Sequence, residues 1–349
     1  MSGRLIIRAD ASPAIGVGHV MRCLALAQAW QDAGGRATMA WSEMPGSLLD
    51  RLRREGLDLA PVHAPPGSPA DAEQTAQVAR ERNANWVVTD GYHFDPSYHQ
   101  RLRAVGLKLM ALDDMAHLKH YDVDLLLNQN LSATRELYSN KTDVSTKLLL
   151  GPRYGLLRRE FRACQEWTRP PAHEPLRLMV SFGGSDTGNI TGLILQSLSR
   201  SQPGKFQVVV LAGAANPHVA ELRQLASDSS FPCEIRVAVD NVAEVMAWAD
   251  VAITAAGSTV WELVSMKLPA LVGALAENQI AGLPALQSIP FFRVALVGEL
   301  VSWNLAAAVA SLLSSLQGIN LNDPATRNGL DANGASRVVE ALARLSPLS

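Results

Sequence analysis

The chain has few cysteines and little net charge, and each shortage disfavours a class of protein. Only Cys23, Cys164 and Cys233 are cysteines among 349 residues, and they form no C-x-x-C pair. An odd, scattered set argues against a disulfide framework or a structural zinc site and indicates a reducing compartment. With 31 basic and 33 acidic residues the formal charge is −2, so the basic excess of proteins that bind nucleic acid or anionic lipid is missing.

Long apolar runs are missing as well. No run approaches the ~20 residues that a membrane-spanning helix needs. Residues 1–8 carry charge and have a strand-like pattern, unlike a secretory signal peptide. We therefore expect a cytoplasmic protein without membrane insertion, and we expect it to act as a monomer without a cofactor or metal.

The order of apolar segments predicts an α/β protein with two domains. The length favours two cores of roughly 150–180 residues each, and short apolar runs alternate with amphipathic stretches, as in parallel βαβ units. Strands are expected at 5–9, 37–41, 86–89, 107–112 and 123–127, then at 176–181, 206–211, 234–239, 251–254 and 270–272. Helices are expected at 19–33, 70–82, 96–105 and 335–344.

A proline-rich segment divides the two series. Residues 167–175 contain three prolines, which neither a helix nor a strand accommodates well. We place an N-terminal Rossmann-like domain at 1–165, a second one at 175–334, and a C-terminal helix in 335–349. Because ligands of such folds bind beyond the carboxyl ends of the strands, the residues after each strand are the ones to search.

The loop after the first strand contains the first candidate for chemistry. Gly16 and Gly18 allow a tight turn and close approach to a ligand, but their spacing matches neither a dinucleotide-binding fingerprint nor a P-loop. His19 stands where the next helix begins, a position that disfavours the imidazolium and keeps the ring neutral. His19 is thus either a general base that accepts a proton from water or a histidine packed in a loop.

Three loops of the second half have the features of a nucleotide site. The glycine-rich loop at 183–189 exposes backbone N–H groups suited to phosphate, or is simply a turn. At 257–262, Gly257, Ser258 and Thr259 could meet a pyrophosphate and Glu262 a ribose diol, although Thr259-x-x-Glu262 is also a capping box. Asn278 and Gln279 place amides at a third helix start, where Asn278 is alternatively an N-cap.

Other signals are discounted. Asp122-Val-Asp124 has a spacing used for metal binding but begins a strand, where both side chains are expected in solvent. The adjacent Asp113 and Asp114 would repel an anionic ligand. His117 and His120 lack a third ligand at useful spacing for zinc, and no G-x-S-x-G motif is present for an α/β-hydrolase triad.

Several of these motifs together resemble a known family. Residues 8–12, followed by Ile-Gly-Val-Gly-His-Val-Met-Arg-Cys-Leu at 15–24, are similar to the opening of the UDP-2,4-diacetamido-2,4,6-trideoxy-β-L-altropyranose hydrolases (PseG) of pseudaminic acid biosynthesis. Further similar segments are 90–92, 113–114, 150–158, 183–186, 256–262 and 277–279. The resemblance covers about residues 4–285, and 288–298 departs from it.

This resemblance implies a fold and a set of roles. The fold would be GT-B-like, similar to MurG, with two Rossmann-like domains whose parallel sheets face each other across a cleft. His19 would activate water, and Glu262 would bind ribose. Val242 would border uracil and Gly257–Thr259 the phosphates. The remaining implied substrate contacts are Gly16, Gly18, Arg22, Tyr92, Gly184, Ser185, Asp186, Asn278 and Gln279.

The implied reaction is inverting hydrolysis of a UDP-linked diacetamido sugar at its anomeric carbon. The partners are then the UDP-sugar and water, and the free sugar would go on to nonulosonic acid synthesis. Three alternatives stay open. A MurG-like transferase would carry an apolar, basic membrane-facing patch, of which the sequence gives no sign. A UDP-sugar-binding protein without activity would not need His19. An epimerase of the same fold would need extra carboxylates near the sugar.

Overall fold

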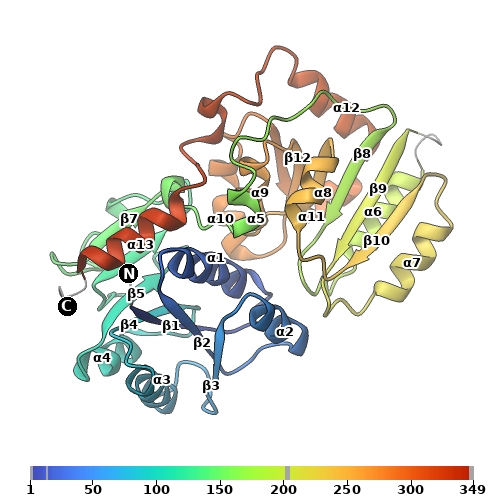
Figure 1. The fold of residues 1–349 in the computed structure, drawn as a ribbon. Coiled ribbons are helices and arrows are strands. Elements are labelled where there is room, and N and C mark those ends of the chain that lie inside the picture. The colour runs from blue at the N-terminus through green and yellow to red at the C-terminus, as the bar shows by residue number, and fades with distance from the viewer. Residues whose placement is uncertain (1–2, 13–14, 201–204, 346–349) are drawn as a thin grey trace. The chain divides into compact units, whose positions relative to one another are not determined.

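The computed structural model describes residues 3–12, 15–200 and 205–345 and divides the chain into two compact units. The first unit contains Met1–Arg159 and Asp331–Ser349, and the second contains Glu160–Leu330 (Figure 1). Parts of the predicted N-terminus, of the first post-strand loop and of segment 335–349 lie outside the described residues, as does the side chain of Asn278.

The first unit is built on a seven-stranded parallel sheet in the order β3-β2-β1-β4-β5-β6-β7. The strands are β1 (Arg4–Ala9), β2 (Arg36–Trp41), β3 (Asp58–Pro61), β4 (Trp86–Asp90), β5 (Lys108–Leu112), β6 (Leu125–Asn128) and β7 (Lys147–Leu150). The central strands β1 and β4 are almost entirely buried, as expected for parallel strands covered on both faces.

Helices cover both faces of this sheet. They are α1 (Gly18–Asp32), α2 (Gly46–Arg54), α3 (Pro69–Glu81), α4 (Pro96–Ala104) and α13 (Gly334–Leu345). One core joins the sheet to α1, α2 and α13, and another joins its opposite face to α3 and α4 (Figure 1). The chain thus returns to the first unit for its last helix.

The second unit has a six-stranded parallel sheet in the order β10-β9-β8-β11-β12-β13. Its strands are β8 (Leu176–Ser181), β9 (Phe206–Ala212), β10 (Cys233–Val237), β11 (Val251–Ala255), β12 (Ala270–Ala274) and β13 (Phe292–Leu296). Its helices are α6 (Ile190–Ser199), α7 (Val219–Ser227), α8 (Val242–Trp248), α9 (Thr259–Ser265), α10 (Glu277–Leu286), α11 (Val297–Ser302) and α12 (Leu305–Ser315). Side chains of α6, α7, α11 and α12 form one core with the sheet.

The proline-rich segment is packed on the second unit. Arg169 donates hydrogen bonds to the backbone carbonyls of Met246, Ala249 and Met266. Burial in this setting lowers the pKa of Arg169 to about 10. The division between the units falls between Arg159 and Glu160, within the short helix α5 (Arg159–Arg162).

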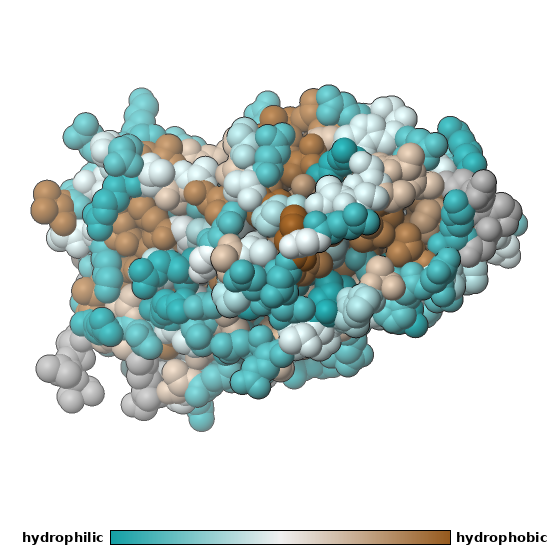
Figure 2. Space-filling model, turned by 90° about the horizontal axis from the view of Figure 1, so that it is seen from above, coloured by the Kyte–Doolittle hydropathy of each residue, from teal (hydrophilic) through white to brown (hydrophobic). Residues whose placement is uncertain are grey.

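The predicted strands and helices are all present with shifts of a few residues at their ends, and β3, β7 and β13 were not anticipated. β3 and β13 are edge strands with two exposed residues each, and β3 ends in proline, so neither has a continuous apolar pattern. Among the described residues, no helix is long and apolar enough to cross a membrane. On the face seen in Figure 2, hydrophobic residues lie in separate groups among hydrophilic ones.

The packing of α13 predicts that truncating Leu342, which is fully buried in the first core, destabilises the first unit by about 2–5 kcal/mol. Hydrogen exchange of the Leu342→Ala variant should therefore speed up in strands β1 and β4. Arg344→Ala, at an exposed ion pair on the same helix, should have little effect. Equal acceleration in strands of both units would contradict the assignment of α13 to the first core.

Candidate functional site

The predicted residues of the first unit lie at the carboxyl ends of three neighbouring strands. Gly16, Gly18 and His19 follow β1, Tyr92 follows β4, and Asp113 and Asp114 follow β5. Because β1, β4 and β5 are adjacent in the sheet, residues far apart in the sequence meet at one edge.

The loop after β1 is held from below by a buried ion cluster. Asp10, at the end of β1, accepts hydrogen bonds from the backbone of Ser42 and Glu43 at 2.7 and 3.0 Å. Its carboxylate pairs with the buried Arg8 at 2.7 Å and lies 3.3 Å from Nε2 of His93. Gly16, at φ +74°, then turns the chain toward α1, a conformation that suits glycine.

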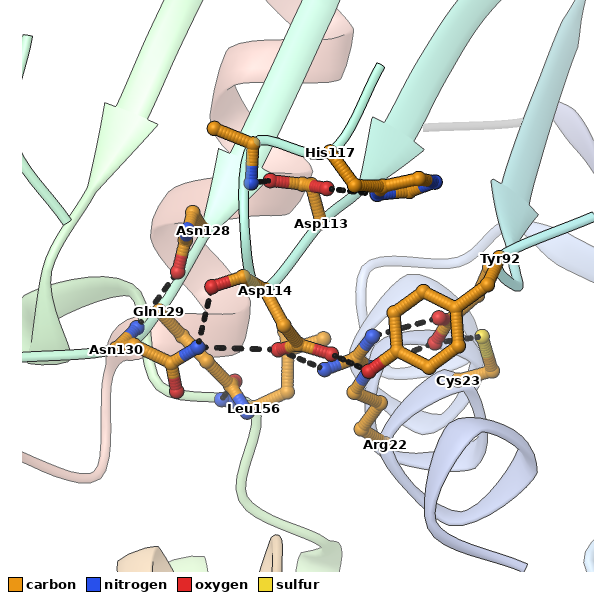
Figure 3. A network of polar contacts seen from close by, with 12 residues as sticks. Arg22, Cys23, Tyr92, Asp113, Asp114, His117, Asn128, Gln129, Asn130 and Leu156 are labelled. Carbon is orange, nitrogen blue, oxygen red and sulfur yellow. Dashed lines mark hydrogen bonds and ion pairs between the residues drawn. The ribbon is translucent and has the colours of Figure 1, made fainter. Parts of the chain in front are cut away.

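Arg22 is the centre of the polar network at this edge. Its guanidinium donates to both carboxylate oxygens of Asp90 at 2.7 and 2.6 Å and to Asp114 at 2.7 Å (Figure 3). The Cys23 thiol adds a longer contact to Asp90 at 3.4 Å. Arg22 was predicted as a substrate contact, and the structure places it beneath the surface, 8% exposed, where all three of its nitrogens contact carboxylates.

Asp114 carries this network outward to Tyr92. It accepts a hydrogen bond from the Tyr92 hydroxyl at 3.1 Å and another from the amide of Asn130 at 3.1 Å. Burial raises the pKa of Asp114, but the Arg22 charge and hydrogen bond outweigh it and bring the pKa to about 2. Tyr92 therefore rests on a carboxylate that stays ionised.

His19 lies against the ring of Tyr92. The two ring centroids are 5.1 Å apart in an edge-to-face arrangement. Burial lowers the pKa of His19 below its ordinary 6.5, and Arg22 adds to this, whereas Asp90 and Asp114 oppose it. The ring is therefore neutral at pH 7 and can accept a proton, as the sequence predicts, although burial is the main cause rather than the helix end.

Asp113 points away from this network and is fully satisfied. It accepts hydrogen bonds from the hydroxyls of Tyr138 and Tyr121 at 2.6 and 2.8 Å, and its oxygen Oδ1 lies 3.2 Å from Nδ1 of His117. The expectation that two adjacent carboxylates would repel an anionic ligand rested on two uncompensated charges. In the structure Asp114 is paired with Arg22, and Asp113 is enclosed by donors.

Apart from Val242, the predicted residues of the second unit follow β8, β11 and β12, which are again adjacent strands. After β8, Gly183 has φ +92°. The backbone of Gly184 packs closely on Gly213, because a Cβ added to Gly213 would lie 2.0 Å from the carbonyl oxygen of Gly184. The two carboxylate oxygens of Asp186 accept hydrogen bonds from the backbone of Ile190 and Thr191 in the first turn of α6, whose N-cap is Asn189. Ser185 lies between the Gly183–Gly184 turn and Asp186.

The loops after β11 and β12 approach each other. A Cβ on Gly257 would lie 4.0 Å from the side-chain amide of Gln279, which in turn accepts a hydrogen bond from the backbone of Leu275 at 2.9 Å. Helix α9 begins at Thr259 with Ser258 before it, and the Ser258 side chain forms no capping hydrogen bond. Thr259 is therefore the first helical residue rather than the N-cap that a capping box requires.

Two further predicted contacts are placed less centrally. Glu262 is half-buried on α9, one turn after Thr259. Val242 begins α8, which follows the edge strand β10, so it stands apart in sheet order from the loops after β11 and β12. Within the described residues, no group of three or more His, Cys, Asp or Glu side chains could hold a metal ion.

Sequence reasoning did not anticipate the partners of Arg22. Asp90 joins the site through Arg22, and Asn130 joins it through Asp114. The side chain of Asn128 accepts a hydrogen bond from the backbone of Asn130. The side chain of Gln129 accepts one from the backbone of Leu156. The available signal was their position, because each stands at the end of a buried strand or directly after one.

The burial of His19 predicts an acid-sensitive component of stability. The unfolded chain protonates His19 near pH 6.5 and the folded chain only at lower pH, so the free energy of unfolding should fall as the pH drops below about 6.5. An NMR titration should place the His19 pKa below 6.5, and His19→Gln should remove this part of the pH dependence. A titration midpoint at or above 6.5 would contradict the burial argument.

Comparison with known proteins agrees with this picture. A model of the glycosyltransferase family 28 C-terminal domain matches residues 178–279. The chain is 24% identical over 267 residues to the UDP-2,4-diacetamido-2,4,6-trideoxy-beta-L-altropyranose hydrolase of Campylobacter jejuni, a match that covers 76% of this chain and 89% of that protein. It is also 24% identical over 284 residues to the uncharacterized protein MJ1062 of Methanocaldococcus jannaschii. That match covers 79% of this chain but only 56% of MJ1062.

Among solved structures, Acinetobacter baumannii MurG resembles the chain with a TM-score of 0.64 at 14% identity, covering 99% of this chain and all of that one. At such identity the likeness concerns the fold, and it confirms the predicted α/β, GT-B-like class. The resemblance predicted from the motifs is thus confirmed: the chain is similar to the altropyranose hydrolase, shares a GT-B-like fold with MurG, and matches the model of the glycosyltransferase family 28 C-terminal domain over residues 178–279.

Proposed function

We propose that the protein hydrolyses a UDP-linked 2,4-diacetamido-2,4,6-trideoxy sugar, with His19 as the general base. The observation that carries this proposal is His19 itself, a partly buried histidine with a lowered pKa, which follows a strand end and lies against Tyr92. A base must be neutral at the working pH and fixed near its target. The similarity to the Campylobacter hydrolase supports the choice of substrate.

The UDP group is assigned to the second unit. Its loops after β11 and β12 bring Gly257 and Gln279 together, and the Gly183–Gly184 turn follows the neighbouring β8. Close backbone approach and amide donors suit phosphate oxygens and sugar hydroxyls. Glu262, as a carboxylate acceptor, would bind the ribose diol, and the match of family 28 to 178–279 supports a nucleotide site here.

The reaction is a single displacement. The oxygen of water attacks the anomeric carbon, His19 takes the proton from that water, and the bond from the anomeric carbon to the phosphate oxygen breaks. UDP leaves with the electron pair, and the configuration at the anomeric carbon inverts. Fixed donors around the departing diphosphate would stabilise its charge. The residues of this chain thus bind, orient and move one proton.

A sugar transferase is the second candidate, favoured by the family 28 match and by the likeness to MurG. In that reaction an acceptor hydroxyl replaces water, and His19 would deprotonate it. The two reactions differ only in what occupies the position next to His19.

Turnover in oxygen-18 water should distinguish these reactions. Incubated with the UDP-diacetamido-trideoxy-altrose, the protein should release unlabelled UDP and free sugar labelled at the anomeric oxygen. His19→Ala should lose at least 100-fold in rate, within the usual range for a general base, and should still bind UDP.

The outcomes of this experiment separate cleanly. Label in UDP would show attack at phosphorus and overturn the mechanism. UDP binding without turnover by the wild type, restored by adding an acceptor alcohol, would establish a transferase. Retention of activity by His19→Ala would remove His19 from the role of base.

The ribose assignment predicts that Glu262→Gln weakens UDP binding by roughly 10–100-fold, because hydrogen bonds to a charged group contribute about 1.5–3 kcal/mol. Calorimetry should show a much smaller loss with 2′,3′-dideoxy-UDP, since that ligand has no diol. Glu234→Gln, an exposed residue on the edge strand β10, should bind UDP normally. An equal loss for both ligands would contradict contact with the ribose.

A further inference from the structure

A second histidine at this edge of the first unit, His117, is held by a contact with a carboxylate. His117 lies in the loop after β5, and its Nδ1 is 3.2 Å from Oδ1 of Asp113. Neither the sequence motifs nor the proposed hydrolysis assigns it a role. Its side chain is 29% exposed, so it is anchored on one side and accessible on the other.

The surroundings of Asp113 determine which nitrogen of His117 carries the proton. Burial raises the pKa of Asp113, yet hydrogen bonds from His117, Tyr138 and Tyr121 lower it below its ordinary value. An ionised carboxylate only accepts hydrogen bonds, so Nδ1 of His117 must be the donor. When the ring carries no second proton, Nε2 presents a lone pair, because the partner of one nitrogen fixes the tautomer.

Nε2 of His117 is available to a ligand. It forms no hydrogen bond with any residue that the structure describes. Figure 3 shows this nitrogen at the end of the ring turned away from Asp113. The site therefore holds a hydrogen-bond acceptor that is fixed in direction by the Asp113 contact behind it.

Tyr92 lies between His117 and His19, the proposed base. Its ring packs edge-to-face on His117 at 5.5 Å and on His19 at 5.1 Å. The two imidazoles thus flank one aromatic ring, and a pyranose is also a six-membered ring. A sugar with its anomeric carbon near His19 would extend a ring substituent toward His117.

We propose that His117 is a specificity-determining residue that accepts a hydrogen bond through Nε2 from the N–H of an acylamino substituent on the sugar. This inference rests on the proposed function for the identity of the sugar. An acceptor that cannot donate favours a substituent with an N–H and disfavours one that offers only oxygen acceptors. The pairing of Asp113 with His117 sets this polarity.

His117→Phe tests the proposal because it keeps a ring against Tyr92 and removes both nitrogens. Asp113 retains the donors of Tyr121, Tyr138 and the backbone of Ala116, so the loop should keep its shape. For the diacetamido substrate, kcat/KM should fall about tenfold, mainly through KM, as expected for one neutral hydrogen bond. His120→Phe, an exposed histidine of the same loop, is the matched control.

Substrate analogues sharpen this result. Two analogues each have one acetamido group replaced by a carbonyl oxygen. With the analogue that lacks the N–H bound by His117, wild type and His117→Phe should have the same kcat/KM. UDP affinity should be the same in both proteins. An equal loss for all three substrates, or no loss for any, would overturn the proposal.

A measurement independent of turnover separates this proposal from the hydrolysis. Nitrogen-15 NMR of labelled histidine should show His117 protonated at Nδ1 and bare at Nε2, and the Nε2 signal should move when the UDP-diacetamido sugar is added but not with UDP alone. If the wild type does not hydrolyse the sugar while Nε2 responds, the hydrolysis fails and the contact stands. A proton on Nε2, or no response to the sugar, would overturn the role of His117.

Discussion

The ion pairing of Arg22 is the interaction on which the first unit's site depends. One guanidinium on α1 joins the end of β4 through Asp90 to the loop after β5 through Asp114. Burial alone would lower the pKa of Arg22, but the two carboxylates raise it well above its ordinary value. Removing one member of such a buried set leaves an uncompensated charge, at a cost of about 3–5 kcal/mol. The start of α1, the end of β4 and the loop after β5 are therefore held together by this one set of ion pairs.

These ion pairs explain how side chains from three separate loops keep a fixed arrangement. Tyr92 is placed by its hydrogen bond to Asp114, its ring packs on His19 and His117, and His117 is also held by its contact with Asp113. Each aromatic contact is weak alone, but Tyr92 is also held by its hydrogen bond to the ionised Asp114, which is itself paired with Arg22. Rigid support of this kind from neighbouring side chains is what a catalytic geometry requires.

Local pattern was sufficient to predict the fold but only part of the site. The strand at 176–181 is found as predicted because most of its residues are apolar and its centre, 178–180, is buried, whereas the short edge strand β3 gives no such signal. His19 was identified from its place at a helix start. Arg22 pairs with Asp90, which is 68 positions away in the sequence, and with Asp114, which is 92 positions away. Pairing across such separations has no local sequence signature, so the sequence predicted Arg22 as a substrate contact but not its ion pairs.

The same network also sets the strength of the base. Asp90 and Asp114 carry two negative charges near His19 and Arg22 carries one positive charge, so the charges alone would favour the imidazolium. Burial opposes this and is the largest effect, which leaves the pKa of His19 below 6.5. A more exposed His19 beside the same carboxylates would be protonated over more of the neutral range and could not accept a proton from water. The burial of His19 at the start of α1 therefore determines whether this histidine can act as a base.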